Sequence, residues 1–175
     1  MRAGLLFAFC LLAGLSFAED ETLVQQPATR QASLAFGVGN DVAGVGLTAE
    51  WYYGDSRFSV FAGGGYVYDS HDGRGATGAG AAAGLRAYSS GRKHRMFAEV
   101  SFSPVAVEVA PEGSGLRGET ICYGPGASVG YNLVTHGGFT LSLSAGVAQA
   151  VTGPSNVNGA YLLSTMALGY TWVRR

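Results

Sequence analysis

The sequence is poor in charge and has no long apolar run beyond its first residues, and each shortage excludes a class of protein. Only 13% of the 175 residues are Asp, Glu, Lys or Arg, against roughly 25% in typical soluble domains. A soluble domain with so few charges would associate through its surface. The formal net charge is −1, so no strongly basic face is available for nucleic acid. No run of about 18 apolar residues, the length that a transmembrane helix needs, follows the N-terminal segment.

The first apolar stretch has the three parts of a secretory signal peptide. Arg2 supplies the positive charge, residues 5–15 form a short apolar region, and Ser16 and Ala18 place small residues at a cleavage site. The apolar region is too short to span a bilayer comfortably. We therefore expect a signal peptide over 1–18, cleavage after Ala18 and export of the mature chain.

Cysteine is scarce as well. The chain has 2 cysteines, and cleavage would remove Cys10, so the exported protein could not form an internal disulfide. Cys122 is expected to act as a small apolar filler. No histidine lies near Cys122 in the sequence to activate it as a catalytic thiol.

What the sequence does contain is a regular alternation of small or polar residues with apolar residues. Period two is typical of β-strands, and the clusters between the alternating segments are rich in the Gly, Asn, Asp and Ser that turns require. Residues 19–31 are polar and are expected to form a lead-in before a β-barrel over 32–173. Within the barrel we count eight segments: 32–39, 42–53, 57–68, 76–88, 95–109, 119–134, 139–151 and 160–173.

The two faces of these segments differ in polarity. One face holds most of the large apolar residues, and the other holds Gly, Ser, Thr and Ala with Glu50, Arg86, Glu99 and Asn132. A lipocalin-like barrel with the apolar face inside would leave its outside almost free of charge. A membrane barrel has the apolar face outside, so that Glu50, Arg86 and Glu99 can pair in the interior. We therefore predict an all-β, eight-stranded antiparallel up-and-down transmembrane β-barrel, which closes without the free edge that lipid forbids.

Aromatic residues gather near the predicted strand ends. Two belts at the two ends of the strands are the girdle pattern of outer-membrane barrels. The general enrichment of aromatics in strands does not predict such clustering. The expected girdle comprises Trp51, Tyr53, Tyr66, Tyr131, Tyr170 and Trp172.

The connection lengths predict an orientation. If the N-terminus is periplasmic, the longer connections 69–75, 110–118 and 152–159 lie outside, together with the short turn 40–41. The connections 54–56, 89–93 and 135–138 then lie in the periplasm, which agrees with the short periplasmic turns of such barrels. The outer connections are acidic and the periplasmic ones basic, and we interpret the acidic residues, Asp41 among them, as a solvated outer rim.

Signal peptide, eight alternating strands, aromatic belts and the closing segment 161–172 resemble the small bacterial outer-membrane barrels of the OmpA/OmpX/Opa-like type. The resemblance covers 32–173 and is one of pattern, without a motif that assigns a subfamily. It implies the outer membrane of a Gram-negative bacterium, with outer-membrane lipids, lipopolysaccharide and the barrel-assembly machinery as partners. Such proteins commonly end on an aromatic residue that this machinery reads, whereas this chain ends with Val173, Arg174 and Arg175.

Asp69, Ser70 and His71 are the polar cluster with the most chemical potential. A histidine beside a serine and a carboxylate supplies the parts of an acyl-transfer site, so a lipid A acyl-modifying enzyme is an alternative function. The same residue types are also ordinary in turns. Asp69, His71 and Asp72 lack a fourth ligand for a metal, and we predict neither a metal nor a cofactor.

Pro104 and Pro125 are predicted to lie close together across one hairpin near the outer rim. Each lacks the N–H that a strand ladder needs, so the pair indicates either a β-bulge or a lateral opening for a lipid chain. Eight strands usually enclose a filled interior, and a narrow small-solute channel is a third possible function. The leading hypothesis is a structural or surface-interaction protein of the outer membrane without enzymatic activity.

Overall fold

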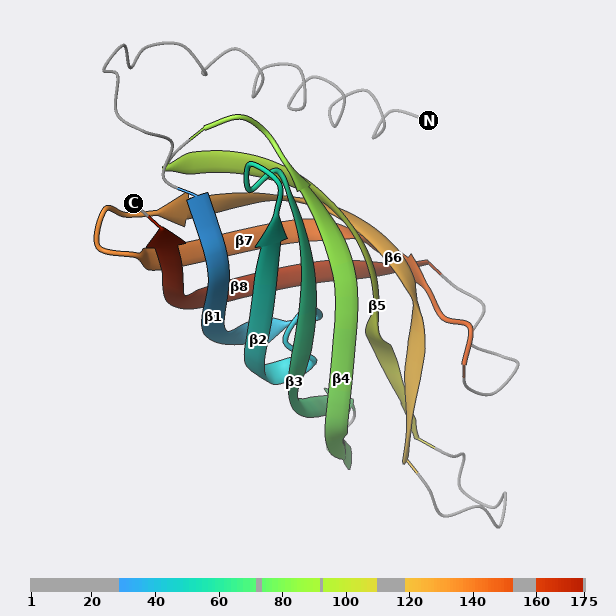
Figure 1. Cartoon of the computed structure of the whole chain (residues 1–175). Coiled ribbons are helices and arrows are strands. Elements are labelled where there is room, and N and C mark those ends of the chain that lie inside the picture. Colours follow the sequence, from blue (N-terminus) through green and yellow to red (C-terminus); the bar gives the residue numbers. More distant parts are fainter. Residues whose placement is uncertain (1–28, 72–73, 92, 110–118, 153–159, 175) are drawn as a thin grey trace.

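The computed structural model describes residues 29–71, 74–91, 93–109, 119–152 and 160–174. Within them, eight antiparallel strands pair in sequence order and close into one barrel (Figure 1), which confirms the predicted all-β, eight-stranded antiparallel up-and-down barrel. The expected signal peptide 1–18 lies outside the described residues. The strands are β1 (Thr29–Gly39), β2 (Gly44–Tyr53), β3 (Phe58–His71), β4 (Arg74–Tyr88), β5 (His94–Val109), β6 (Glu119–Val134), β7 (Phe139–Gln149) and β8 (Ala160–Arg174).

The barrel begins earlier than the sequence predicted. β1 starts at Thr29, so residues 29–31 belong to the barrel and not to the polar lead-in. Arg30 pairs with Val173 of β8, and its buried side chain donates a hydrogen bond of 2.7 Å to Asn132 Oδ1. Arg30 is charged and has its partner inside the barrel, so this part of β1 does not show the alternation of apolar residues that marks the other strands. We call this end of the barrel, where Thr29 and Arg174 lie, the terminal end, and the opposite end the loop end.

The predicted loop 69–75 is too long. β3 runs to His71 and β4 starts at Arg74, and these two residues pair directly. Asp69, Ser70 and His71 therefore lie on a strand and not in a loop. The strands of this hairpin are hydrogen-bonded to each other up to its end, and the residues there are polar. The apolar alternation that marks the other strands is therefore missing here.

β7 is shorter than predicted, since it ends at Gln149 instead of continuing to residue 151. The N–H groups of Val151 and Thr152 both donate to the carbonyl oxygen of Tyr123, at 2.9 and 3.1 Å. These bonds continue the β6–β7 register beyond its last ladder pair, Gly126–Ala148, so the chain stays beside β6 after β7 ends.

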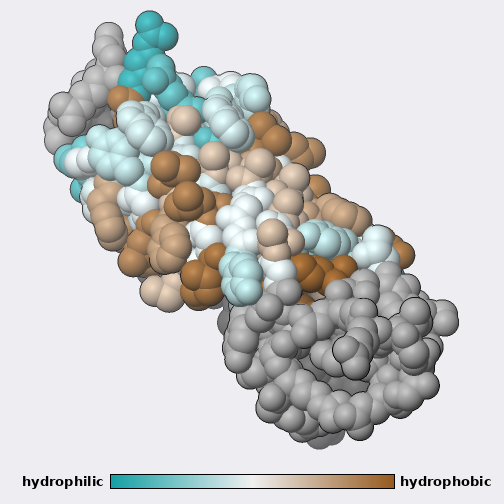
Figure 2. Space-filling model, turned by 90° about the horizontal axis from the view of Figure 1, so that it is seen from below, coloured by the Kyte–Doolittle hydropathy of each residue, from teal (hydrophilic) through white to brown (hydrophobic). Residues whose placement is uncertain are grey.

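The polarity of the barrel is inverted relative to a soluble protein. Its outer wall exposes large apolar side chains, among them Leu34, Phe36, Leu47, Leu85 and Val100, and Figure 2 shows apolar side chains spread over the wall. Its interior encloses charged and hydroxyl-bearing side chains together with a small aromatic cluster of Tyr52, Tyr88 and Phe97. In the described part of the chain no helix is long and apolar enough to cross a membrane.

The wall is uneven between β4 and β5. Their common ladder ends at the pair Ala83–Phe102, although both strands continue toward the loop end and separate there (Figure 1). β6 side chains cover the seam: the Ala81 N–H donates to the Tyr123 hydroxyl at 3.3 Å. A methyl group added at Gly78 would lie 2.9 Å from Ile121 Cδ1.

The two prolines lie beside this seam. Phe102 pairs with Pro125 and Pro104 pairs with Tyr123, so the prolines are near each other across the β5–β6 hairpin. The register shifts between Pro104 and Ala106, which is a β-bulge, and the β5–β6 ladder then continues to its end. The interruption of the wall therefore lies between β4 and β5 and not between the two strands that carry the prolines.

Candidate functional site in the barrel interior

The connection between β1 and β2 folds into the barrel. Val42 and Ala43 are 0% exposed and Asp41 is 2% exposed, so this turn is not part of an acidic outer rim. The Ala43 N–H donates to the Asn40 carbonyl oxygen at 3.0 Å and closes the turn. Gly39 and Gly44 flank the turn with φ angles of 125° and 98°, values that glycine adopts without steric cost.

Glycines on the inner wall make room for this turn. A methyl group at Gly63 would overlap the Asp41 carbonyl oxygen, and one at Gly65 would overlap the Val42 carbonyl oxygen. At Gly80 the added methyl group would lie 3.1 Å from Ala43 Cβ. Part of the high glycine content therefore leaves the space that residues 40–43 occupy.

Polar bonds fix the turn to opposite sides of the barrel. The Asn40 N–H donates to the Ser164 carbonyl oxygen at 3.1 Å, and the Ser164 N–H donates to Asn40 Oδ1 at 3.0 Å. The Asp41 N–H donates to Thr165 Oγ1 at 3.1 Å. The side-chain amide of Asn40 donates to the Pro104 carbonyl oxygen at 2.7 Å. The turn thereby connects β8 to β5 through the interior.

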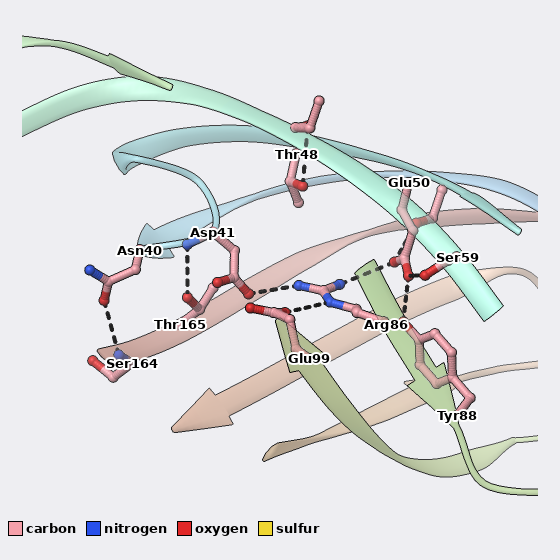
Figure 3. A network of polar contacts seen from close by, with 12 residues as sticks. Asn40, Asp41, Thr48, Glu50, Ser59, Arg86, Tyr88, Glu99, Ser164 and Thr165 are labelled. Carbon is pink, nitrogen blue, oxygen red and sulfur yellow. Dashed lines mark hydrogen bonds and ion pairs between the residues drawn. The ribbon is translucent and has the colours of Figure 1, made fainter. Parts of the chain in front are cut away.

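Arg86 lies at the centre of the buried charges (Figure 3). Its Nη2 is 2.6 Å from Asp41 Oδ2, its Nη1 is 3.1 Å from Glu50 Oε2, and its Nε is 2.7 Å from Glu99 Oε2. The structure thus brings together the three residues expected to pair and adds Asp41 to them. This role of Asp41 was not predicted, because a turn residue normally faces solvent.

Two aromatic rings cover the faces of the same guanidinium. Arg86 Cζ is 4.4 Å from the centroid of the Phe61 ring and 4.7 Å from that of the Phe97 ring. The carboxylates accept hydrogen bonds from the N–H groups at the edge of the planar guanidinium, while the aromatic rings stack on its faces. Arginine permits this arrangement and lysine does not.

Glu50 is surrounded by hydroxyl donors. The Tyr88 hydroxyl lies 2.5 Å from Glu50 Oε1 and the Tyr52 hydroxyl lies 3.1 Å from Glu50 Oε2. Ser59 also donates to Oε1, and Ser33 donates to Oε2 at 3.5 Å. With Arg86 added, both oxygens of this buried carboxylate have partners, which offsets the cost of burying the charge.

Glu99 is bonded on one side only. Its Oε2 faces Arg86, whereas its Oε1 is buried and has no hydrogen-bond partner. The hydroxyls of Ser101, Ser103 and Ser128 are also buried without a partner. Among the described residues, no group of three or more His, Cys, Asp or Glu side chains is arranged to hold a metal ion.

Among the residues whose side chains the structure describes, the remaining buried cations lie toward the terminal end, away from this cluster. Arg95 donates to the carbonyl oxygens of Gly91 and Ser56 at 2.6 and 2.5 Å. Arg95 Cζ lies 5.8 Å from the ring centroid of Tyr88, and Arg30 Cζ lies 5.9 Å from that of Tyr52. The two tyrosines therefore stand between these arginines and Glu50. Arg30 and Arg95 were missed because each looks, in sequence, like a residue outside or at the edge of the alternating pattern.

The other predicted site residues are dispersed. The side chains of Asp69, Ser70 and His71 lie outside the described part of the structure, so an acyl-transfer arrangement there stays a prediction. Tyr131 is partly exposed and hydrogen-bonded to a ring nitrogen of His94. The remaining expected girdle residues are exposed on the outer wall: Trp51, Tyr53, Tyr66, Tyr170 and Trp172.

A comparison with models of protein families found no match for this chain, and neither did a comparison with curated proteins. The feature that distinguishes this barrel is its geometry: an apolar outer wall surrounds an interior occupied by a turn and an ion network.

Proposed function

We propose that this protein is an outer-membrane barrel of a Gram-negative bacterium, with a structural or surface-interaction role and no enzymatic activity. The observation that carries the proposal is the inverted polarity of the wall. Leu34, Leu85 and Val100 point outward while Arg86 and its carboxylates are enclosed. In water this arrangement exposes an apolar belt, but in a bilayer the belt is solvated by lipid tails.

The filled interior favours a structural role over a channel. Residues 40–43 and the Arg86 network occupy the lumen and connect β8, β5, β4 and β2. A narrow small-solute channel, the third function considered, would require this turn to leave the interior and at least three hydrogen bonds of Asn40 and Asp41 to break. A barrel held from within suits a protein that presents its loop end to lipopolysaccharide or to a surface partner.

The proposed partners follow from the surfaces of the barrel. The apolar belt would contact outer-membrane lipids, with girdle residues such as Trp51 and Trp172 at the membrane interface. The hairpins of the loop end would face lipopolysaccharide. The barrel-assembly machinery would act on the exported chain.

The proposal is tested by expressing the full chain in a Gram-negative host. We expect the protein in the outer-membrane fraction, with a gel mobility that changes on heating because a folded barrel resists the detergent. Recovery in the soluble fraction would contradict the membrane assignment.

The same cells test the enzymatic alternative. Mass spectra of lipid A should match those of cells that carry an empty vector. A gained or lost acyl chain that disappears in His71→Ala would identify a lipid A acyl-modifying enzyme instead. Recordings of the purified barrel in planar bilayers should show no regular conductance steps, and such steps would support the channel.

A further inference from the structure

Four buried oxygen atoms on two neighbouring strands have no hydrogen-bond partner. They are Glu99 Oε1 and the hydroxyl oxygens of Ser101, Ser103 and Ser128. The four residues are between 0% and 8% exposed. Buried polar atoms without a partner are rare in folded proteins and call for an explanation such as a bound water or ion.

These oxygens lie along one stripe of the inner wall. Ser128 on β6 is paired directly opposite Glu99 on β5, so the two side chains leave the same face of the sheet with their Cβ atoms about 5 Å apart. Ser101 and Ser103 follow Glu99 on the same face, because alternate residues of a strand point to the same side. Glu99, Ser101 and Ser128 are therefore neighbours on one patch of the inner wall, and Ser103 continues the stripe toward the loop end.

The charges that meet at Arg86, beside this patch, are unbalanced. Asp41, Glu50 and Glu99 all contact the single guanidinium of Arg86. Glu50 shares its charge with several hydroxyl donors. Glu99 Oε1 receives no such donor, and Figure 3 shows that only one of its two oxygens is engaged by Arg86.

We propose that Glu99 Oε1 and the hydroxyls of Ser101 and Ser128 bind a small monovalent cation, of the size of Na⁺, inside the barrel. The site offers only oxygen atoms, which are the ligands of hard cations. It offers a single uncommitted carboxylate oxygen, which suits one positive charge better than two. Ser103 lies one step further along the stripe and contacts a water molecule bound to the ion.

The test measures thermal unfolding of the full mature chain, folded in detergent, in chloride salts of Li⁺, Na⁺, K⁺ and N-methyl-D-glucamine at equal ionic strength and pH. N-methyl-D-glucamine screens charge equally but is too large to enter the barrel. We expect the unfolding temperature to rise saturably with one of the small cations, by about 5–10 °C at a concentration near one hundred times its Kd. Equal unfolding temperatures in all four salts would overturn the proposal.

Two variants locate the site and one serves as a matched control. Glu99→Gln should abolish the dependence on the small cation, and Ser128→Ala should weaken its apparent affinity about tenfold through the loss of one ligand oxygen. Ser142→Ala removes another buried serine hydroxyl, on β7, and should leave the cation dependence unchanged.

A proton is the competing occupant of Glu99 Oε1. If the wild-type protein gains stability as the pH falls but responds equally to all four salts, the oxygen is protonated and no cation site exists. If Glu99→Gln does not fold, the four salts compared on the wild-type protein still decide between the two outcomes.

Discussion

Replacing Arg86 separates the contribution of its charge from that of its shape. Arg86→Met would leave Asp41, Glu50 and Glu99 without their shared cation, and removing one partner of a buried ion pair costs about 3–5 kcal/mol. Arg86→Lys would keep the charge. It would lose the planar fork that reaches three carboxylates and the stacking on Phe61 and Phe97, so we expect a loss of about 2–4 kcal/mol.

The measurement is urea unfolding of the barrel in phospholipid vesicles, followed by the fluorescence of Trp51 and Trp172. The free energy of unfolding should fall in the order wild type, Arg86→Lys, Arg86→Met. Arg57 is exposed, and Arg57→Met should change the stability by less than about 0.5 kcal/mol. Adding Asp41→Asn to Arg86→Met should recover about 1 kcal/mol or more, since it removes one of the uncompensated charges. If both Arg86 variants were as stable as the wild type, the ion network would not support the barrel.

Three further outcomes follow from other parts of the wall. Gly63→Ala should destabilise the barrel by about 1–3 kcal/mol in the same urea assay, because the methyl group overlaps the Asp41 carbonyl oxygen; Gly64→Ala, whose methyl group would meet nothing closer than 3.9 Å, is the control. If lipid covers the outer wall as proposed, Leu85→Arg should cost about 2–4 kcal/mol in the vesicles, whereas in detergent-free buffer it should improve solubility if the wall faces water instead. Tyr123→Phe removes the acceptor of the Ala81 N–H, so hydrogen exchange of the Ala81 amide should accelerate while that of Leu85, within the β4–β5 ladder, should not.

The eight strands and the pairing of Glu50, Arg86 and Glu99 were accessible from sequence for one physical reason. The barrel wall has an apolar face and a polar face, and successive residues of a strand point to opposite faces. Period two therefore appears in the sequence wherever side chains occupy both faces. Opposite charges that recur on the small-residue face indicate internal pairs, because that face has no water to solvate them separately.

The inward turn and the β4–β5 seam were not accessible in this way. The position of Asp41 depends on the absence of side chains at Gly63 and Gly65, which lie on a different strand. The point at which the β4–β5 ladder ends depends on how the two strands are aligned. The alternation within one strand does not show that alignment. The hydrogen bond between Arg30 and Asn132 was not predicted because Asn132 lies on β6, far from Arg30 in sequence. In each case the deciding contact is long-range.

The inward turn also has a consequence for the order of folding. Its side-chain bond to Pro104 joins residues 64 apart in sequence, and its bonds to Ser164 and Thr165 join residues 124 apart. Contacts of such separation form late, because the chain between them must be brought together first. The bonds to β8 can form only when β8 has reached β1, so the turn takes its place in the interior only after the barrel has closed. We therefore expect a slow final kinetic phase in which a paired but loose cylinder becomes resistant to denaturant as residues 40–43 enter it.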